Sequence, residues 1–104
     1  MKKVHNKLVR DFIPQIIAQD GKKAHVRTLD EKEMIACLKN KLIEEVNEYL
    51  ENESVEELAD VLEVIYALCQ NKKISIEELE RTRKRKKIAR GSFDEGVFLE
   101  YVED

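Results

Sequence analysis

Three short polar residues, each followed three positions later by a glutamate, mark where helices begin in this chain of 104 residues. The pairs are Asp30 with Glu33, Ser54 with Glu57, and Ser75 with Glu78. In such a capping box the polar side chain accepts a hydrogen bond from a backbone N–H of the first helical turn, and the glutamate can return one. After the first two pairs, apolar residues recur at intervals of three and four, as on one face of a helix. The sequence therefore predicts helices over Glu31–Leu50, Val55–Gln70 and Ile76–Ala89.

A shorter helix is predicted before these, over Ile13–Gln19. Pro14 suits the opening turn of a helix because its ring fixes a helical φ angle, and Gly21 is suited to end it. Residues 22–29 alternate without helical spacing, so we expect a loop or a short extended piece there. The chain is predicted to be all-α, a small bundle of about four helices forming a single domain over residues 1–104.

The tail after Gly91, Ser92–Asp104, is too apolar for a disordered end. Its apolar residues include Phe93, Val97, Phe98, Leu99 and Tyr101. We expect the tail to pack on the bundle or on a neighbouring subunit. A chain of this length buries only a modest fraction of its surface by itself. Self-association into a dimer or tetramer would therefore help to complete the core.

Opposite charges are segregated along the chain, which has a net charge of −3 and a charged fraction of 39%. Acids dominate Glu44–Asp60, whereas Arg81–Arg90 is basic and contains no acid. The chain is acidic overall and has no aromatic residues among these cations, so a nucleic-acid partner is disfavoured.

No stretch of the sequence has the apolar length of a signal peptide or of a membrane span. Cys37 and Cys69 are too few and too far apart to indicate a disulfide scaffold or a thiolate metal site. We expect both to be reduced, small apolar residues of the helices. These features favour a soluble cytoplasmic protein without a membrane partner.

Two pairs of carboxylates interrupt the apolar stripes of two neighbouring predicted helices. At about 100° per residue, Glu45 and Glu57 fall within the stripes, and Glu48 and Asp60 fall at their edges. Acids on a buried face are costly unless something neutralises them. Antiparallel packing through a turn at Glu51–Glu53 would aim all four carboxylates at one site, where Mg²⁺ or Mn²⁺ would supply the counter-charge.

Simpler interpretations of single residues stay open. Glu57 is also the glutamate of the Ser54 capping box, and that structural role would explain it alone. Glu44, taken alone, is more often a surface residue than a site residue. These interpretations do not explain why the same placement of acids occurs on two adjacent helices.

The two acidic segments match a known pattern. EEVNE at Glu44–Glu48 followed by EELAD at Glu56–Asp60 resembles the EExxE…ExxD signature of the all-α NTP pyrophosphatase superfamily. This superfamily includes the MazG proteins, the dimeric dUTPases and the phosphoribosyl-ATP pyrophosphatases. Lys41, three residues before Glu44, agrees with the phosphoribosyl-ATP pyrophosphatase version of the pattern.

Both ends of the chain extend the resemblance. KLVRDFIPQII at Lys7–Ile17 resembles the KLVRDKIPEII start of small MazG-like proteins, with Phe12 and Gln15 as departures. RGSF at Arg90–Phe93 is similar to their RGGF tail. The resemblance therefore spans nearly the whole chain.

The resemblance implies Mg²⁺-dependent hydrolysis of a nucleoside triphosphate, or a related nucleotide, to the monophosphate and pyrophosphate. By motif position, it implies four metal ligands: Glu45, Glu48, Glu57 and Asp60. It gives catalytic roles to Glu44, a candidate base for the attacking water, and to Glu45. Such chemistry agrees with a metal ion that neutralises phosphate oxygens and lowers the pKa of bound water.

A polyphosphate also needs cations. The candidates for binding the substrate are Lys7, Arg10, Lys41, Arg83, Lys86, Lys87 and Arg90. Arginine forks suit bidentate contacts with phosphate. The cations at the end of the last predicted helix have a simpler alternative role: they would be solvent-exposed and would interact favourably with the helix dipole.

Three other functions stay open. The first is the phosphoribosyl-ATP pyrophosphatase reaction of histidine synthesis, which Lys41 and the adjacent acids favour. The second is a non-catalytic helical module that binds a nucleotide or a partner. The third is a purely structural bundle.

Overall fold

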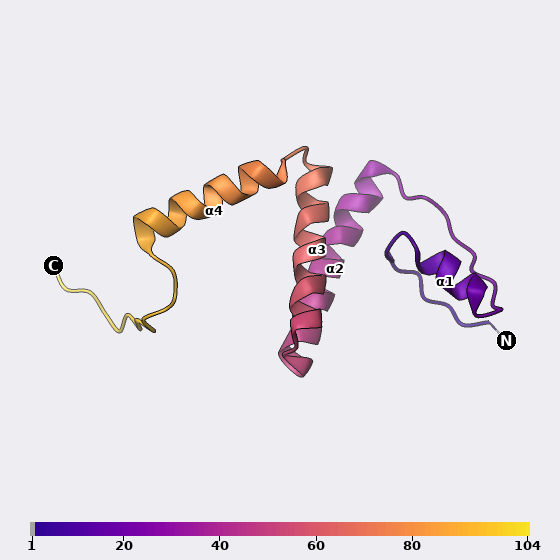
Figure 1. Ribbon diagram of the computed structural model, residues 1–104, viewed down its shortest axis with the longest axis horizontal. Coiled ribbons are helices and arrows are strands. Elements are labelled where there is room, and N and C mark those ends of the chain that lie inside the picture. Colours follow the sequence, from indigo (N-terminus) through magenta and orange to yellow (C-terminus); the bar gives the residue numbers. More distant parts are fainter. Residues whose placement is uncertain (1) are drawn as a thin grey trace. The chain divides into compact units, whose positions relative to one another are not determined.

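The computed structural model describes residues 2–104, and all regular elements in this part of the chain are α-helices (Figure 1). They are α1 (Ile13–Gln19), α2 (Glu31–Asn52), α3 (Val55–Asn71) and α4 (Ile76–Arg90). The predicted all-α class with about four helices is confirmed. The chain divides into two compact units, Met1–Lys73 and Ile74–Asp104, and each is described by itself. A single functional domain over the whole chain stays a prediction.

The helices begin where the sequence predicts: a side-chain cap fixes the start of α2, α3 and α4, and Pro14 lies in the opening turn of α1. The side chains of Asp30, Ser54 and Ser75 each accept from the backbone N–H three residues on. The helix ends are less well predicted. Helix α2 continues to Asn52 rather than Leu50, and Glu53 then adopts a left-handed conformation with φ 51°. The turn predicted at Glu51–Glu53 is therefore wrong in its bounds, because α2 includes Glu51 and Asn52. Glutamate favours the helical conformation, and the turn begins only at Glu53.

Helices α2 and α3 are the packing partners within the first unit, and they run antiparallel side by side (Figure 1). Their contact buries Leu38 of α2 together with Val64 and Cys69 of α3. Cys37 is half-buried, and both cysteines are free. The expectation that both cysteines belong to helices is confirmed, and their reduced state stays a prediction. The hairpin of α2 and α3 is the scaffold on which the acidic residues sit.

The hairpin leaves much apolar surface uncovered in the single chain. Ile43 is 61% exposed and Leu50 65% exposed on α2, and Leu58 is 50% exposed on α3. Val46, Val55 and Leu62 are also exposed. The narrow core therefore agrees with the expectation that a chain of this size buries little by itself.

The second unit consists of α4 and the tail. Helix α4 ends at Arg90 and is capped by Gly91, whose φ of 82° suits glycine because it has no Cβ. The tail Ser92–Asp104 contains no helix or strand, and its aromatic side chains Phe93 and Phe98 are 99% and 86% exposed. A packing partner for this tail stays a prediction. Across residues 2–104, no helix is long and apolar enough to cross a membrane.

Candidate metal centre

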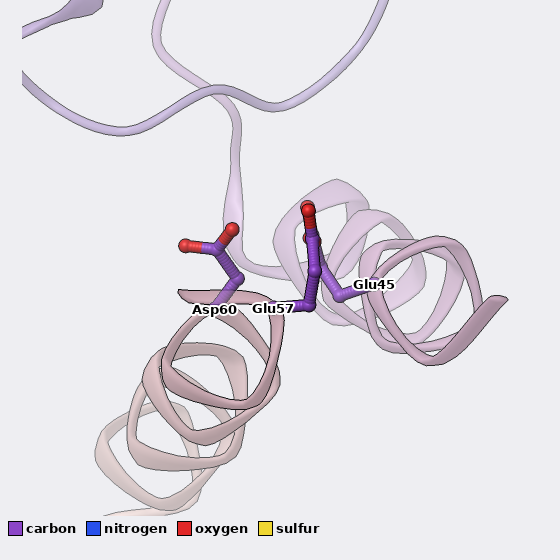
Figure 2. A group of neighbouring side chains, drawn as sticks. All are labelled: Glu45, Glu57 and Asp60. Carbon is purple, nitrogen blue, oxygen red and sulfur yellow. The ribbon is translucent and has the colours of Figure 1, made fainter. Parts of the chain in front are cut away.

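Three of the four predicted metal ligands lie together on the hairpin. Glu45 comes from α2, and Glu57 and Asp60 come from the start of α3 (Figure 2). One carboxylate oxygen from each residue lies within 4.8 Å of the other two. The Glu45 side chain is 12% exposed and that of Asp60 is 39% exposed. The cluster is thus an acidic patch on the hairpin, more covered at Glu45 than at Asp60.

Local geometry explains why these residues meet. Glu57 and Asp60 are three residues apart and therefore share one face of α3. The connection between the helices is only Glu53 and Ser54, so the end of α2 and the start of α3 stay adjacent. This short connection brings Glu45, two turns before the end of α2, beside the first turns of α3.

Glu57 takes part in the helix cap without using its carboxylate. Its backbone N–H donates to Ser54 Oγ at 3.3 Å. Among the hydrogen bonds of residues 2–104, the Glu57 carboxylate does not return one to the Ser54 backbone. In α2, by contrast, Glu33 Oε1 accepts from the Asp30 N–H at 3.3 Å, which completes a capping box. The two roles considered for Glu57 are therefore separated: its N–H serves the cap, and its carboxylate belongs to the cluster.

The Glu57 carboxylate is poorly satisfied. Its Oε1 accepts from the Asn52 side-chain amide at 3.5 Å, whereas its Oε2 is buried and has no hydrogen-bond partner within the described part of the chain. Burial raises the pKa of Glu57, and the negative charges of Glu48, Asp60 and Glu45 raise it further. A buried, unpartnered carboxylate oxygen is costly unless a cation or donor meets it.

Glu48, the fourth predicted ligand, lies outside this group of oxygens. It is an exposed residue of α2. Its charge is nevertheless near enough to raise the pKa of Glu57. The structure thus brings together three of the four predicted ligands, and the role of Glu48 as a ligand stays a prediction.

Lys41 forms ion pairs with two acids of α2, Glu44 and the cluster residue Glu45. Its Nζ lies 3.5 Å from Glu44 Oε1 and 3.5 Å from Glu45 Oε1. The Lys41 side chain is only 18% exposed, so this ammonium lies against the helix surface. Glu44, a candidate base, is thus held by cations and is not among the clustered oxygens.

The segment before α1 also contributes cations. Arg10 Nη2 donates to Asp60 Oδ1 at 2.6 Å, and Lys7 Nζ lies 3.9 Å from Glu44 Oε1. Both cations are predicted from the sequence as phosphate ligands, whereas no sequence signal predicts their contacts with carboxylates. No motif marks Asn52 either, although its amide donates to Glu57.

The basic residues of α4 belong to the second unit. Arg83 Nε donates to Glu80 Oε2 at 2.8 Å on the same helix. Lys86 and Arg90 are exposed, and Lys87 and Arg90 occupy the last turn, where cations favour the helix dipole. A role for Arg83, Lys86 and Arg90 in binding phosphate stays a prediction.

Comparisons with protein-family models, with curated proteins and with solved structures found no match for this chain. The fold and the site define an all-α protein that carries a cluster of three carboxylates on a helical hairpin. Chemically, such a cluster offers hard oxygen ligands and a concentrated negative charge, which are the requirements for binding a divalent cation.

Proposed function

We propose that this protein is a nucleotide pyrophosphohydrolase that depends on Mg²⁺ or Mn²⁺ and splits a nucleoside triphosphate into a monophosphate and pyrophosphate. The observation that carries the proposal is the cluster of Glu45, Glu57 and Asp60, with oxygens within 4.8 Å of one another. The nucleotide substrate is proposed from the resemblance of the two acidic segments to the EExxE…ExxD signature.

The residues of the cluster fit a divalent cation. All three offer carboxylate oxygens, the ligand type that Mg²⁺ prefers. The Glu57 Oε2 atom is buried without a hydrogen-bond partner among the described residues, and a cation would satisfy it. Glu48 is exposed and its charge acts on Glu57, and it is proposed as the fourth ligand.

Each residue around the cluster then has a defined task. Glu45, Glu57 and Asp60 hold the cation, which, when bound, neutralises phosphate oxygens and lowers the pKa of a bound water. Lys41 fixes Glu44 and Glu45 through its contacts of 3.5 Å with each. Glu44 accepts the proton of the attacking water. The hairpin thus supplies an anchored set of acids, as preorganised catalysis requires.

The phosphate groups need positive charge beside the cluster. Lys7 and Arg10 lie against Glu44 and Asp60, which places two cations next to the proposed metal site. Arg83, Lys86 and Arg90 of α4 are further candidates for binding the substrate. The two cations of the first unit, Lys7 and Arg10, supply positive charge of the kind that a triphosphate bound through a metal requires.

The active form is proposed to be a homodimer or homotetramer in the cytoplasm. The support is the apolar surface that the hairpin leaves exposed, including Ile43, Leu50 and Leu58. A second copy would cover these side chains and complete a core that one chain leaves narrow.

The experiment is a pyrophosphate-release assay on a panel of canonical and damaged nucleoside triphosphates. Turnover of at least one nucleotide with Mg²⁺, and its loss in excess chelator, would support the proposal. Absence of turnover of every nucleotide with both Mg²⁺ and Mn²⁺ would overturn it. Calorimetry that detected nucleotide binding without hydrolysis would instead support a non-catalytic binding module.

A second candidate, phosphoribosyl-ATP pyrophosphatase, rests on Lys41. This residue agrees with that family's version of the motif and contacts both Glu44 and Glu45. The KLVRD opening at Lys7–Asp11 points away from it. Rescue of a histidine auxotroph lacking this activity would favour phosphoribosyl-ATP pyrophosphatase. Failure to rescue would favour the nucleoside triphosphate pyrophosphohydrolase.

A further inference from the structure

Arg10 holds the side chain of a candidate metal ligand. Its Nη2 lies 2.6 Å from Asp60 Oδ1, the length of a strong charge-assisted hydrogen bond. The two residues are fifty positions apart in the sequence. Arg10 belongs to the non-helical segment before α1, which also brings Lys7 Nζ to 3.9 Å from Glu44 Oε1. The segment thus contacts the carboxylate cluster at Asp60 and a neighbouring acid, Glu44.

Arg10 and a divalent cation would act on the same carboxylate. Without a metal, the guanidinium offsets the charge of Asp60 next to two other acids, Glu45 and Glu57. A cation bound by Asp60 would lie within a few ångströms of the guanidinium, and like charges at that distance repel each other. The Arg10 and Asp60 side chains are 56% and 39% exposed. A half-exposed ion pair is weak enough to be displaced.

We propose that residues Lys7–Arg10 form a strap over the carboxylate cluster, and that Arg10 competes with the divalent cation for Asp60. The inference rests on the proposed function, because it assumes that the cluster binds a metal. Metal binding would release Arg10 from Asp60. The freed guanidinium would then be available beside the site to bind the phosphate groups of the nucleotide. Loading of the metal and recruitment of the substrate are thereby coupled through one side chain.

The test is a titration with Mn²⁺ in which the free ion is measured by electron paramagnetic resonance. Arg10→Gln removes the competing charge, so its Kd for Mn²⁺ should fall about three- to fivefold below that of the wild type, the range expected for an exposed ion pair. Arg27→Gln is the matched control. It removes the same charge from a pair of similar length, 2.7 Å between Arg27 Nη2 and Glu33 Oε2, outside the carboxylate cluster.

The control should bind Mn²⁺ like the wild type. If Arg10→Gln bound Mn²⁺ no more tightly than Arg27→Gln, the competition would be refuted. If it bound Mn²⁺ more weakly, Arg10 would instead orient Asp60 for the metal. Both of these results for Arg10→Gln are distinguishable from failure of the proposed function, because in both of them the wild type binds Mn²⁺. If the wild type bound no Mn²⁺ at all, that result would refute the proposed metal site, and it would refute the competition by Arg10 as well.

A second readout follows the Arg10 side chain directly. The Nε–H signal of Arg10 in a nuclear magnetic resonance spectrum reports the state of its guanidinium. Titration with Mg²⁺ should shift this signal towards that of a free arginine, and Asp60→Asn should shift it in the same direction without metal. Mg²⁺ binding that left the Arg10 signal unchanged would contradict the strap.

Discussion

Ser54 Oγ accepts a hydrogen bond from the backbone N–H of Glu57 at 3.3 Å, and the Glu57 carboxylate turns instead to the acids of the cluster. One residue thus serves the start of α3 through its backbone and the proposed metal site through its side chain. The two roles can be separated by substitution, because each depends on different atoms.

Ser54→Ala tests the cap. Loss of the hydroxyl leaves the Glu57 N–H without its acceptor and should lower the free energy of unfolding by about 1 kcal/mol. The variant should still bind Mn²⁺, because the carboxylate cluster keeps its oxygens. Urea unfolding and Mn²⁺ titration of the same preparation measure both quantities. A variant of normal stability would argue against the cap.

Glu57→Gln tests the charge of the cluster. Because burial and the neighbouring acids raise the pKa of Glu57, the folded state disfavours the charged carboxylate. In chelator, the contribution of Glu57 to stability should therefore fall as the pH rises above the ordinary range for glutamate. The amide variant should have the higher melting temperature at pH 8, and its advantage should shrink towards pH 4.

Mg²⁺ should make the wild type melt at a higher temperature than Glu57→Gln. Binding stabilises the folded wild type by mass action, by about 2.7 kcal/mol at a free concentration a hundred times the Kd, but Glu57→Gln should gain little. Glu56→Gln removes a charge from the neighbouring, exposed residue and should respond to Mg²⁺ like the wild type. Melting curves of the three proteins that did not depend on Mg²⁺ would contradict the metal site.

The ion pair of Arg27 and Glu33 should give stability a dependence on acid pH. Nη1 and Nη2 of Arg27 donate to the two carboxylate oxygens at 3.0 and 2.7 Å, and these bonds lower the pKa of Glu33 to about 2. An acid with a lowered pKa stabilises the fold above its unfolded pKa, about 4.3. This contribution is lost as the pH falls towards 2. Wild type should therefore exceed Glu33→Gln in stability at pH 6, and the difference in urea midpoint should shrink between pH 5 and pH 2.

Leu38→Ala tests the narrow core. Leu38 is 2% exposed, so its truncation should cost about 2–5 kcal/mol in the free energy of unfolding. Ile43→Ala on the same helix, where the side chain is 61% exposed, should cost little in a monomer. If Ile43 lies in a subunit contact, the variant should instead dissociate at higher concentration than the wild type. Analytical ultracentrifugation distinguishes these two cases.

Local signals predicted the helix starts because each depends on residues three positions apart, as at Ser54 and Glu57. The end of α2 was predicted less well, since Glu53 takes a left-handed conformation that the sequence does not mark with glycine. Helical periodicity also brought Glu45, Glu57 and Asp60 to one place. It could not predict the contact of Arg10 with Asp60, which joins residues fifty positions apart and depends on the path of a non-helical segment.

The most direct test of the central claim compares two adjacent glutamates in the pyrophosphate-release assay. Glu57 contributes an oxygen to the cluster, whereas Glu56 is an exposed residue outside it. With Mg²⁺ and the best nucleotide of the panel, Glu56→Gln should retain the wild-type rate. Glu57→Gln should lose about a hundredfold or more, as expected when an electrostatic contribution to the transition state is removed. Equal rates of pyrophosphate release from the two variants would contradict the account.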